Sequence, residues 1–314
     1  MGKSISGGIG QTIAVILLLS GLGLTVWNEY RTIRVSLMLN KAEKELVEVD
    51  PSGAVDPALD GELVHLTGVT QSAEPIKDRE TGVEADALLL KREVNYFQLA
   101  EYRDDATDEI TYYEDWMDRP LSSQEYYKAA KRDVNFVYVR LADRKDTCST
   151  VTLGGYRLPK DLIGWVRDYT TGMRITIPEE NMSELRAQAR SATANGAGVP
   201  VHIFGNVIYV GPDPSEPQIG DVRIEYSIVP HGTVSVLGKA QGDEIVQYGS
   251  GREYHILSIM EGYHSAGEIL DEERENNRGG GILVLIFGLI LTAFGLVGSW
   301  DLIKALFRRR TPFE

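Results

Sequence analysis

Residues 279–300 read GGGILVLIFGLILTAFGLVGSW, and this stretch decides the architecture. From Ile282 to Trp300 it contains no charged residue over about 19 positions, which as a helix rises roughly 28 Å. The hydrocarbon core of a bilayer is about 30 Å thick. A second uncharged stretch of the same length, IGQTIAVILLLSGLGLTVW, runs from Ile9 to Trp27. A buried helix of a soluble protein seldom lacks charge over such a length, so we expect transmembrane helices at 9–27 and 282–300.

The N-terminal stretch could instead be a cleaved signal peptide. The residues that follow it, LTVWNEY, offer no pair of small residues in the A-x-A spacing of a cleavage site. A retained signal anchor is therefore expected.

Basic residues next to the second span predict its orientation. Four of them follow Trp300, namely Lys304, Arg308, Arg309 and Arg310, whereas the preceding flank, ILDEERENNRGG, contains four acids. Positively charged flanks stay on the cytoplasmic side. We therefore expect both termini in the cytoplasm, and the domain between the spans outside it. That domain would be periplasmic or extracellular in a bacterium, and luminal in a eukaryote.

The charge distribution excludes one class of partner. The chain carries −14 overall, but residues 1–34 sum to +2 and residues 278–314 to +3, so the segment between them carries −19. A strongly acidic domain has no electrostatic reason to bind nucleic acid. The single cysteine, Cys148, cannot form an intrachain disulfide, and the segment is long enough to fold around its own core.

The central segment alternates strand and helix patterns without a repeat. Strands are predicted at 62–70, 88–102, 109–117 and 221–229, the last with Val222, Ile224, Tyr226 and Ile228 alternating onto one face. The stretch 201–210 predicts a hairpin with its turn at Gly205 and Asn206, and 233–248 predicts two more strands. Helices are predicted at 122–132, from Pro159, and at 177–196. The helix at 122–132 rests on a capping-box spacing of Ser122 and Glu125, and a second box, Ser265 with Glu268, predicts a helix leading into the second span. The fold class is α+β with a mostly antiparallel sheet. The predicted organisation is a juxtamembrane helix at 28–50, an α+β domain at 51–264, a juxtamembrane helix at 265–281, and a basic tail at 301–314.

Motifs that carry chemistry are missing from the sequence. The histidines fall in no metal-ligand spacing; they are His65, His202, His231, His255 and His264. There is no nucleophile elbow, Walker loop or dinucleotide fingerprint. We predict no catalytic residue, no metal ligand and no cofactor.

Small residues of the second span predict a helix-association face. Gly288, Thr292, Gly295 and Ser299 follow one another at spacings of four, three and four, and so lie on one side of a helix. Helices associate in a membrane by close backbone approach, which small residues permit. The alternative is that glycine is simply common in spanning helices. Gly21 and Gly23 offer a weaker counterpart, so the partner is either the first span or a neighbouring chain.

Several blocks of the sequence carry a resemblance to a known family. NEYRTIR, DGELVHLTG, LLLKREVNYFQ, YYEDW, TLGGYRL, PSEPQIGDVRIEYS and KAQGDEIVQY, in this order, resemble the transmembrane protein 43 (LUMA) family over nearly the whole chain. The resemblance implies an integral membrane protein with a large luminal domain. In animals it implies residence in the endoplasmic reticulum and inner nuclear membrane, self-association, and organisation of membrane complexes. No enzymatic residues come with it.

The chain departs from the animal pattern after its second span. Animal members resemble a four-span protein with three C-terminal spans, whereas this chain has one, so either a shorter, bacterial member or a truncated chain is expected. The leading hypothesis is a non-enzymatic membrane scaffold whose partners are the bilayer, itself as a homo-oligomer, and other membrane proteins. The competing hypotheses are a channel or pore component, suggested by the glycine-rich second span, and a membrane-surface enzyme.

Overall fold

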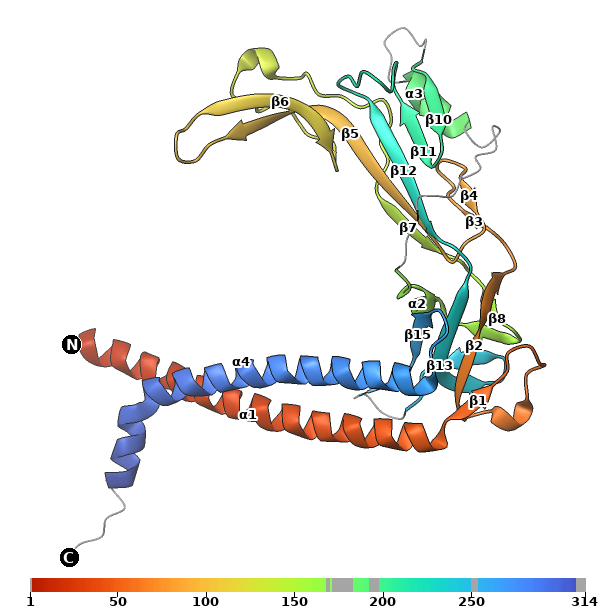
Figure 1. The fold of residues 1–314 in the computed structure, drawn as a ribbon. Coiled ribbons are helices and arrows are strands. Elements are labelled where there is room, and N and C mark those ends of the chain that lie inside the picture. The colour runs from red at the N-terminus through yellow and green to blue at the C-terminus, as the bar shows by residue number, and fades with distance from the viewer. Residues whose placement is uncertain (1, 168–169, 171–182, 192–197, 250–253, 309–314) are drawn as a thin grey trace, which may run out of the picture.

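Two long helices dominate the computed structural model, which describes residues 2–167, 170, 183–191, 198–249 and 254–308. Helices α1 (Gly2–Glu45) and α4 (Ala266–Arg308) pack along each other in opposite directions, with both termini at the same end (Figure 1). Each is long and apolar enough to cross a membrane, within Gly10–Glu45 and Ala266–Trp300. Large apolar side chains such as Leu283 and Val297 are exposed along this part, as lipid-facing residues would be.

The sequence predicts the start of α4 correctly but misplaces the end of α1, the two points at which the helices meet the sheet domain. Helix α4 begins after the expected capping box, in which the Ser265 hydroxyl accepts from the Glu268 amide and a Glu268 oxygen accepts from the Ser265 amide at 2.7 Å. It then continues unbroken to Arg308, past the predicted start of the tail. The predicted helix at 28–50 is too long, because α1 ends at Glu45. The alternating residues Val47–Val49 form β1, which pairs in parallel with Leu63–Ser72.

A seven-stranded sheet lies at the far end of the helix pair. Its strands are, in order, β1 (Val47–Val49), β2 (Leu63–Ser72), β8 (Val151–Leu153), β9 (Tyr156–Leu158), β14 (Glu244–Val246), β13 (Thr233–Gln241) and β15 (Ser258–Glu261). Strand β2 also pairs with β13, so the pairings among β2, β8, β9, β14 and β13 form a closed circuit. One short helix, α2 (Lys160–Ile163), lies beside this sheet and begins after Pro159, as predicted.

A six-stranded sheet extends from the first. It contains β10 (Val201–Phe204), β11 (Val207–Val210), β12 (Val222–Val229), β5 (Leu89–Arg103), β6 (Ile110–Met117) and β7 (Arg144–Thr147). The predicted alternation in β12 is confirmed, since Val222, Ile224, Tyr226 and Ile228 are all buried. The remaining short elements are η1 (Pro57–Leu59), β3 (Ile76–Lys77), β4 (Glu84–Ala85), η2 (Ala129–Lys131) and α3 (Ser183–Ser191).

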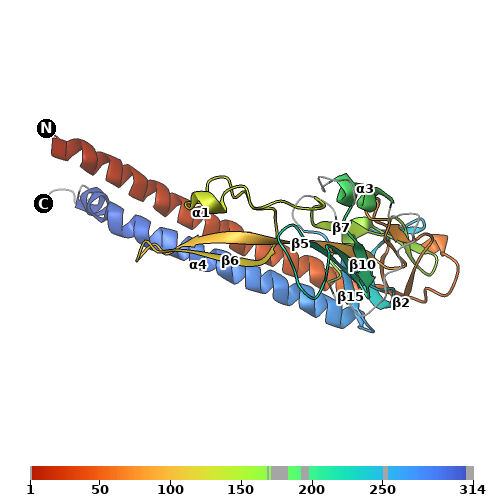
Figure 2. The same ribbon diagram turned by 90° about the horizontal axis from the view of Figure 1, so that it is seen from above.

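The outer half of β5 and the whole of β6 form a ribbon that leaves the body of the domain. Residues Tyr96–Arg103 pair with Ile110–Met117 in antiparallel register. In both views the ribbon runs back over the helix pair, toward the end that holds the termini (Figures 1 and 2). We call it the arm.

The helix predicted at 122–132 is wrong, since this segment contains only the short turn η2. Its polar side chains instead form hydrogen bonds with the arm and with the chain segment that follows. The Tyr126 hydroxyl donates to the Leu99 carbonyl at 2.6 Å, and the Ser123 hydroxyl accepts from the Asn135 amide. Tertiary contacts thus override the local capping signal. The helix predicted at 177–196 is seen as α3; the positions on either side, 177–182 and 192–196, lie outside the described residues.

One main hydrophobic core joins the two sheets, and both sheets contribute fully buried residues to it, among them Leu66, Val236, Leu90 and Ile224. The pairings are antiparallel except those of β1 with β2 and of β9 with β14. The α+β class with a mostly antiparallel sheet is therefore confirmed.

Candidate functional site

The α1–α4 interface is built from glycines that allow backbone contact. A Cβ placed on Gly295 would lie 2.3 Å from the backbone nitrogen of Leu18, and one on Gly21 would lie 2.5 Å from the backbone nitrogen of Thr292. Real Cβ atoms do not approach backbone so closely. Any side chain at these positions would therefore push the helices apart.

The four residues of the predicted association face lie at or beside this interface. Gly288 faces Thr25, with a built Cβ 2.6 Å from its hydroxyl oxygen, and Thr292 contacts Gly21. Ser299 is buried, and its hydroxyl donates to the Gly295 carbonyl at 2.6 Å. The Thr292 hydroxyl likewise donates to Gly288, one turn earlier. Such bonds satisfy polar side chains within their own helix. The contacts described are made with α1 of the same chain; association between chains through this face stays a prediction.

The interface also includes residues that sequence reasoning missed. Gly298 lies against Ala14, with 2.7 Å between a built Cβ and the Ala14 methyl carbon. Asn28 is buried just beyond the first span, and its side-chain amide donates to the Gly281 carbonyl at 3.0 Å. The spacing from Gly288 to Gly295 would have predicted Gly281 as the next position on this face, since it repeats every seven residues. Asn28 gave no such signal, because a polar residue after a span is expected to face water.

Beyond the spans, the two helices are held by a different kind of contact. Val35, Leu39 and Ala42 of α1 form a second buried cluster. Its other members are Ile269 and Leu270 of α4, Leu63 and Leu237 of the seven-stranded sheet, and Ile256, which precedes β15. Arg274 of α4 also bridges the helices, with its guanidinium 2.5 Å from Glu43 of α1, and it pairs at 2.7 Å with Asp271 of its own helix. The helix pair and the sheet domain therefore share a core at their junction.

The predicted cytoplasmic basic flank is only partly described. Lys304 is exposed on α4, with its ammonium 5.4 Å from the centre of the Trp300 ring. Arg308 is the last residue of the helix. Arg309 and Arg310 lie outside the described residues.

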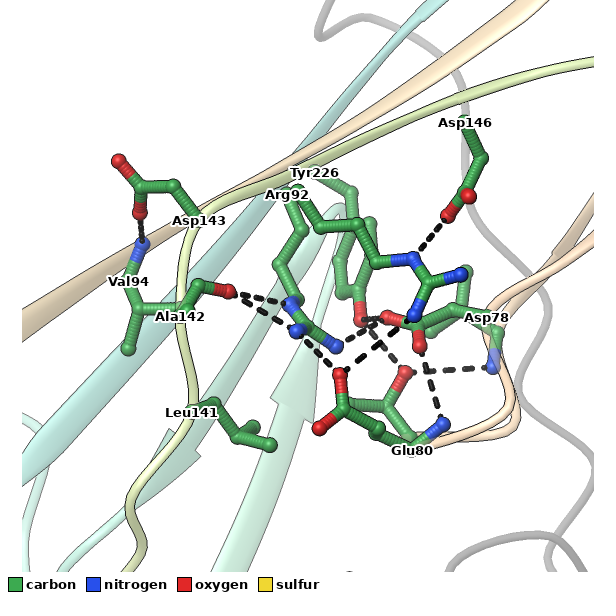
Figure 3. Close-up of polar contacts among 12 residues, drawn as sticks. Asp78, Glu80, Arg92, Val94, Leu141, Ala142, Asp143, Asp146 and Tyr226 are labelled. Atoms are coloured by element: carbon green, nitrogen blue, oxygen red, sulfur yellow. Dashed lines mark hydrogen bonds and ion pairs between the residues drawn. The ribbon is translucent and has the colours of Figure 1, made fainter.

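A buried network of charged side chains surrounds Arg92 and is drawn in Figure 3. The Arg92 guanidinium donates to Asp78 at 2.7 Å and to Glu80 at 2.6 Å, and also to the Ala142 carbonyl. The Tyr226 hydroxyl donates to Asp78 at 2.7 Å. Arg92 and Asp78 are each at most 2% exposed. The network joins the β3–β4 loop to β5, β12 and the segment before β7.

This network holds separate parts of the domain together and does not resemble a reaction centre. Burial alone would raise the pKa of Asp78, but the Tyr226 hydroxyl and the Arg92 charge outweigh it and lower that pKa. Burial and the Asp78 carboxylate raise the pKa of Tyr226. Asp78 therefore stays ionised and Tyr226 protonated at neutral pH, and each charge is matched by a partner. No nucleophile with an adjacent base emerges from this arrangement. Sequence reasoning missed Arg92, on a strand, and Asp78, in a loop, because charged residues are expected to face water.

The histidines are dispersed over the domain. His65 lies 2.5 Å from Glu48, and His231 contacts Ser72 at 2.9 Å. Among the residues that the structure describes, no three histidine, cysteine or acidic side chains are grouped so that they could hold a metal ion.

Comparisons with known proteins agree with the resemblance seen in the sequence. The family model described as "Transmembrane protein 43" matches residues 92–313. A fruit fly protein (Drosophila melanogaster) named "Transmembrane protein 43 homolog" is 25% identical over 310 residues, covering 94% of this chain and 77% of the relative. The rat and human proteins named "Transmembrane protein 43" are each 21% identical over 309 residues, covering 90% of this chain and 73% of the relative. No solved structure matches the chain.

Proposed function

The chain belongs to the transmembrane protein 43 family, and from this premise we propose that it acts as a non-enzymatic membrane scaffold. In this proposal the helix pair anchors the protein, and the sheet domain docks to further copies and to other membrane proteins. Both termini are cytoplasmic and the domain is extracytoplasmic, because Lys304 and the arginines at 308–310 follow the second span. In a eukaryote the membrane would be the endoplasmic reticulum or nuclear envelope.

The observation that carries the proposal is the shared core at the junction. Leu39 of α1 and Leu270 of α4 are buried together with Leu63 and Leu237 of the sheet. A flexible linker would let a domain rotate freely above its anchor, whereas a packed junction fixes its direction relative to the bilayer. A fixed direction is what a scaffold needs to present one surface to its neighbours.

The arm supplies a surface suited to such contacts. Tyr102, Tyr113 and Tyr127 are exposed on it or on the segment packed against it. Tyrosine is enriched in protein interfaces because it offers a large apolar area with a polar end. Strand β6 is also the last strand of its sheet in the described part of the chain. The arm is therefore the part of the domain that we assign to self-association.

Native mass spectrometry of the full chain in detergent tests this proposal. We expect assemblies at multiples of 34.8 kDa, and we expect Tyr102→Ser with Tyr113→Ser to shift them toward the monomer. Tyr263→Ser removes a more exposed tyrosine outside the arm and should leave the assemblies unchanged. A monomer at every concentration would exclude self-association, and identical assemblies in the arm variant would exclude the arm.

The proposed orientation of the chain in the membrane is tested by protease protection. Protease added outside intact cells, or to the lumenal side of vesicles, should digest the sheet domain and spare both termini. A tag at Glu314 that is accessible from the extracytoplasmic side would overturn the orientation.

The channel alternative is weakened by the position of the glycines that suggested it. Gly288 and Gly295 contact α1, while the exposed side chains of the second span, such as Ile286, Phe287 and Leu289, are apolar. An ion pathway needs polar groups or carbonyls along its wall. A bilayer recording should therefore show no currents.

A further inference from the structure

Arg223 of β12 holds a guanidinium that has no acceptor within the chain. The residue is half-buried, and its Nε is buried without a hydrogen-bond partner. Among the residues that the structure describes, its two terminal nitrogens donate no hydrogen bond and form no ion pair. A buried donor that is left unpaired costs stability. Folding stability therefore does not explain an arginine at this position.

Arg92, on the neighbouring strand β5, shows how the same side chain is usually satisfied. Its guanidinium donates to two carboxylates and to a backbone carbonyl. Both arginines belong to the segment between the spans, whose net charge is −19. Acids are therefore plentiful around Arg223, and still none pairs with it in the described structure. Such an unpaired cation indicates an acceptor that comes from outside the chain.

Aromatic rings hold the Arg223 guanidinium in place. It lies over the Trp116 ring, 4.7 Å from the ring centre. The Trp116 ring in turn packs edge-on against Phe97 and Tyr209, with centres 5.3 and 6.1 Å apart. A guanidinium is attracted to the face of an indole and stacks on it. We call Arg223, Trp116, Tyr209 and Phe97 the arginine platform.

The composition of the arginine platform is typical of a protein interface. Tryptophan, tyrosine and arginine are the residues that dominate the binding energy of such interfaces. Stacking also reduces the entropy that the arginine loses when a partner binds, because the planar group is already oriented. The platform is therefore suited to anchor a partner that brings a negative charge.

The strand register places this platform at the base of the arm. Val222 and Tyr96 form the last pair between β12 and β5, where the arm begins. Arg223 follows Val222, and Trp116 lies opposite the second residue of the arm. Nearer the tip, the segment that follows β6 covers the arm. At the base, Arg223 and Trp116 are half-buried, so a partner reaches them without displacing that segment.

We propose that the arginine platform binds an acidic side chain on the extracytoplasmic part of another membrane protein. A carboxylate accepts hydrogen bonds from the terminal nitrogens of Arg223, and a charge-assisted bond of this kind is strong. The surrounding rings exclude water from the pair. This inference rests on the proposed scaffold function. It assigns a surface to partners other than the chain itself, separate from the exposed tyrosines of the arm.

Fluorescence anisotropy with the full chain in detergent tests the assignment. The probe is a fluorescein-labelled peptide, Gly-Glu-Phe-Glu-Gly, together with its counterpart that has glutamine in place of glutamate. We expect the glutamate peptide to bind and the glutamine peptide to bind far more weakly. Removing a hydrogen-bonding charge typically weakens binding roughly 10-fold to 100-fold, which is the loss expected for Arg223→Gln. Arg223→Lys keeps the charge without the planar fork and should fall between.

Arg119→Gln is the matched control. Arg119 is exposed shortly after β6, outside the platform, and its substitution should leave peptide binding unchanged. Arg223→Gln should also leave the melting temperature nearly unchanged, because the guanidinium makes no hydrogen bond in the folded chain. A marked decrease would show that the residue is structural and would overturn the proposal.

Three further results would also overturn the assignment. They are equal binding of the two peptides, parent-like binding by Arg223→Gln, and displacement of the peptide by inorganic phosphate at equal concentration. If the glutamate peptide dissociates the assemblies seen by native mass spectrometry, the occupant is a second copy and not a different protein. Lost peptide binding with intact assemblies contradicts this inference alone. Monomers that still bind the peptide contradict self-association alone.

Discussion

The same two helices are held together in two different ways along their length. Between the expected membrane boundaries the contact consists of small residues, with Gly21 against Gly288 and Gly295 against Leu18. Beyond them it consists of Leu39, Val35 and Ile269 in a hydrophobic cluster. The difference follows from the medium around the helices, which is lipid within the membrane and water beyond it. Lipid tails are as apolar as leucine, so large apolar residues gain nothing by meeting in a bilayer, and helices gain instead from close backbone packing. In water, burying a leucine is itself stabilising.

The largest effect is expected from Gly295→Ile, which adds bulk where the backbones meet. Because the Cβ alone would collide with the Leu18 backbone, we expect the spans to separate locally, at a cost of about 3 kcal/mol or more. A lowered melting temperature of the detergent-solubilised chain, followed by circular dichroism, would report the change.

Val297→Ile adds a similar apolar group on the lipid-facing side, where Val297 is 78% exposed. It should leave the melting temperature unchanged. If Gly295→Ile melts at the same temperature as the parent, the glycines are not needed for the contact.

The next effect is expected from Leu39→Ala in the hydrophobic cluster beyond the membrane. Leu39 is 1% exposed, and truncating a buried leucine costs about 2–5 kcal/mol. The loss should appear in urea unfolding of the detergent-solubilised protein. Ile33→Ala, at an exposed position of the same helix, should change the unfolding free energy by less than about 0.5 kcal/mol. Equal losses for the two variants would contradict the idea that burial in this cluster holds the junction.

A smaller effect is expected from Arg274→Gln, which removes the ionic bridge between the helices. Its partners Glu43 and Asp271 are more than half exposed, and pairs of this kind contribute about 0.2–1 kcal/mol. The decrease in the melting temperature should be small and should vanish at high salt, because exposed charges are screened. A double-mutant cycle with Glu43→Gln measures the coupling. A loss as large as that of Leu39→Ala would show that the ion pair, and not the cluster, dominates this part of the interface.

The smallest effect concerns pH at the start of α4. Hydrogen bonds from the Ser265 amide and hydroxyl lower the pKa of Glu268 below its usual value of 4.5. A carboxylate whose pKa is lowered by folding stabilises the protein above its unfolded pKa, and that contribution is lost as the pH falls through the folded value. The difference in melting temperature between the parent chain and Glu268→Gln should therefore shrink below about pH 4.5. No change in this difference with pH would mean that the cap contributes nothing.

The sequence was a good guide to the elements whose pattern is independent of distant contacts. The β12 alternation, the hairpin of β10 with β11 and the Ser265 capping box were all predicted from spacing and are present. The helix predicted from Ser122 and Glu125 failed, because Tyr126 and Ser123 instead contact the arm and the segment beside it. The Arg92 network could not be foreseen, because its members come from four separate parts of the chain.

What the sequence determined by itself is the pair of apolar helices, the acidic domain between them and the small-residue face of the second span. These depend on composition and on a local period, which any reader of the chain can measure. Only the tertiary structure decided that the small-residue face meets Leu18 and Gly21 of the same chain, and that Arg223 of β12 lies over the Trp116 ring of β6. The physical reason is that a period in the sequence identifies one face of a helix, whereas the partner of that face depends on how the chain returns after the whole domain between Glu45 and Ala266.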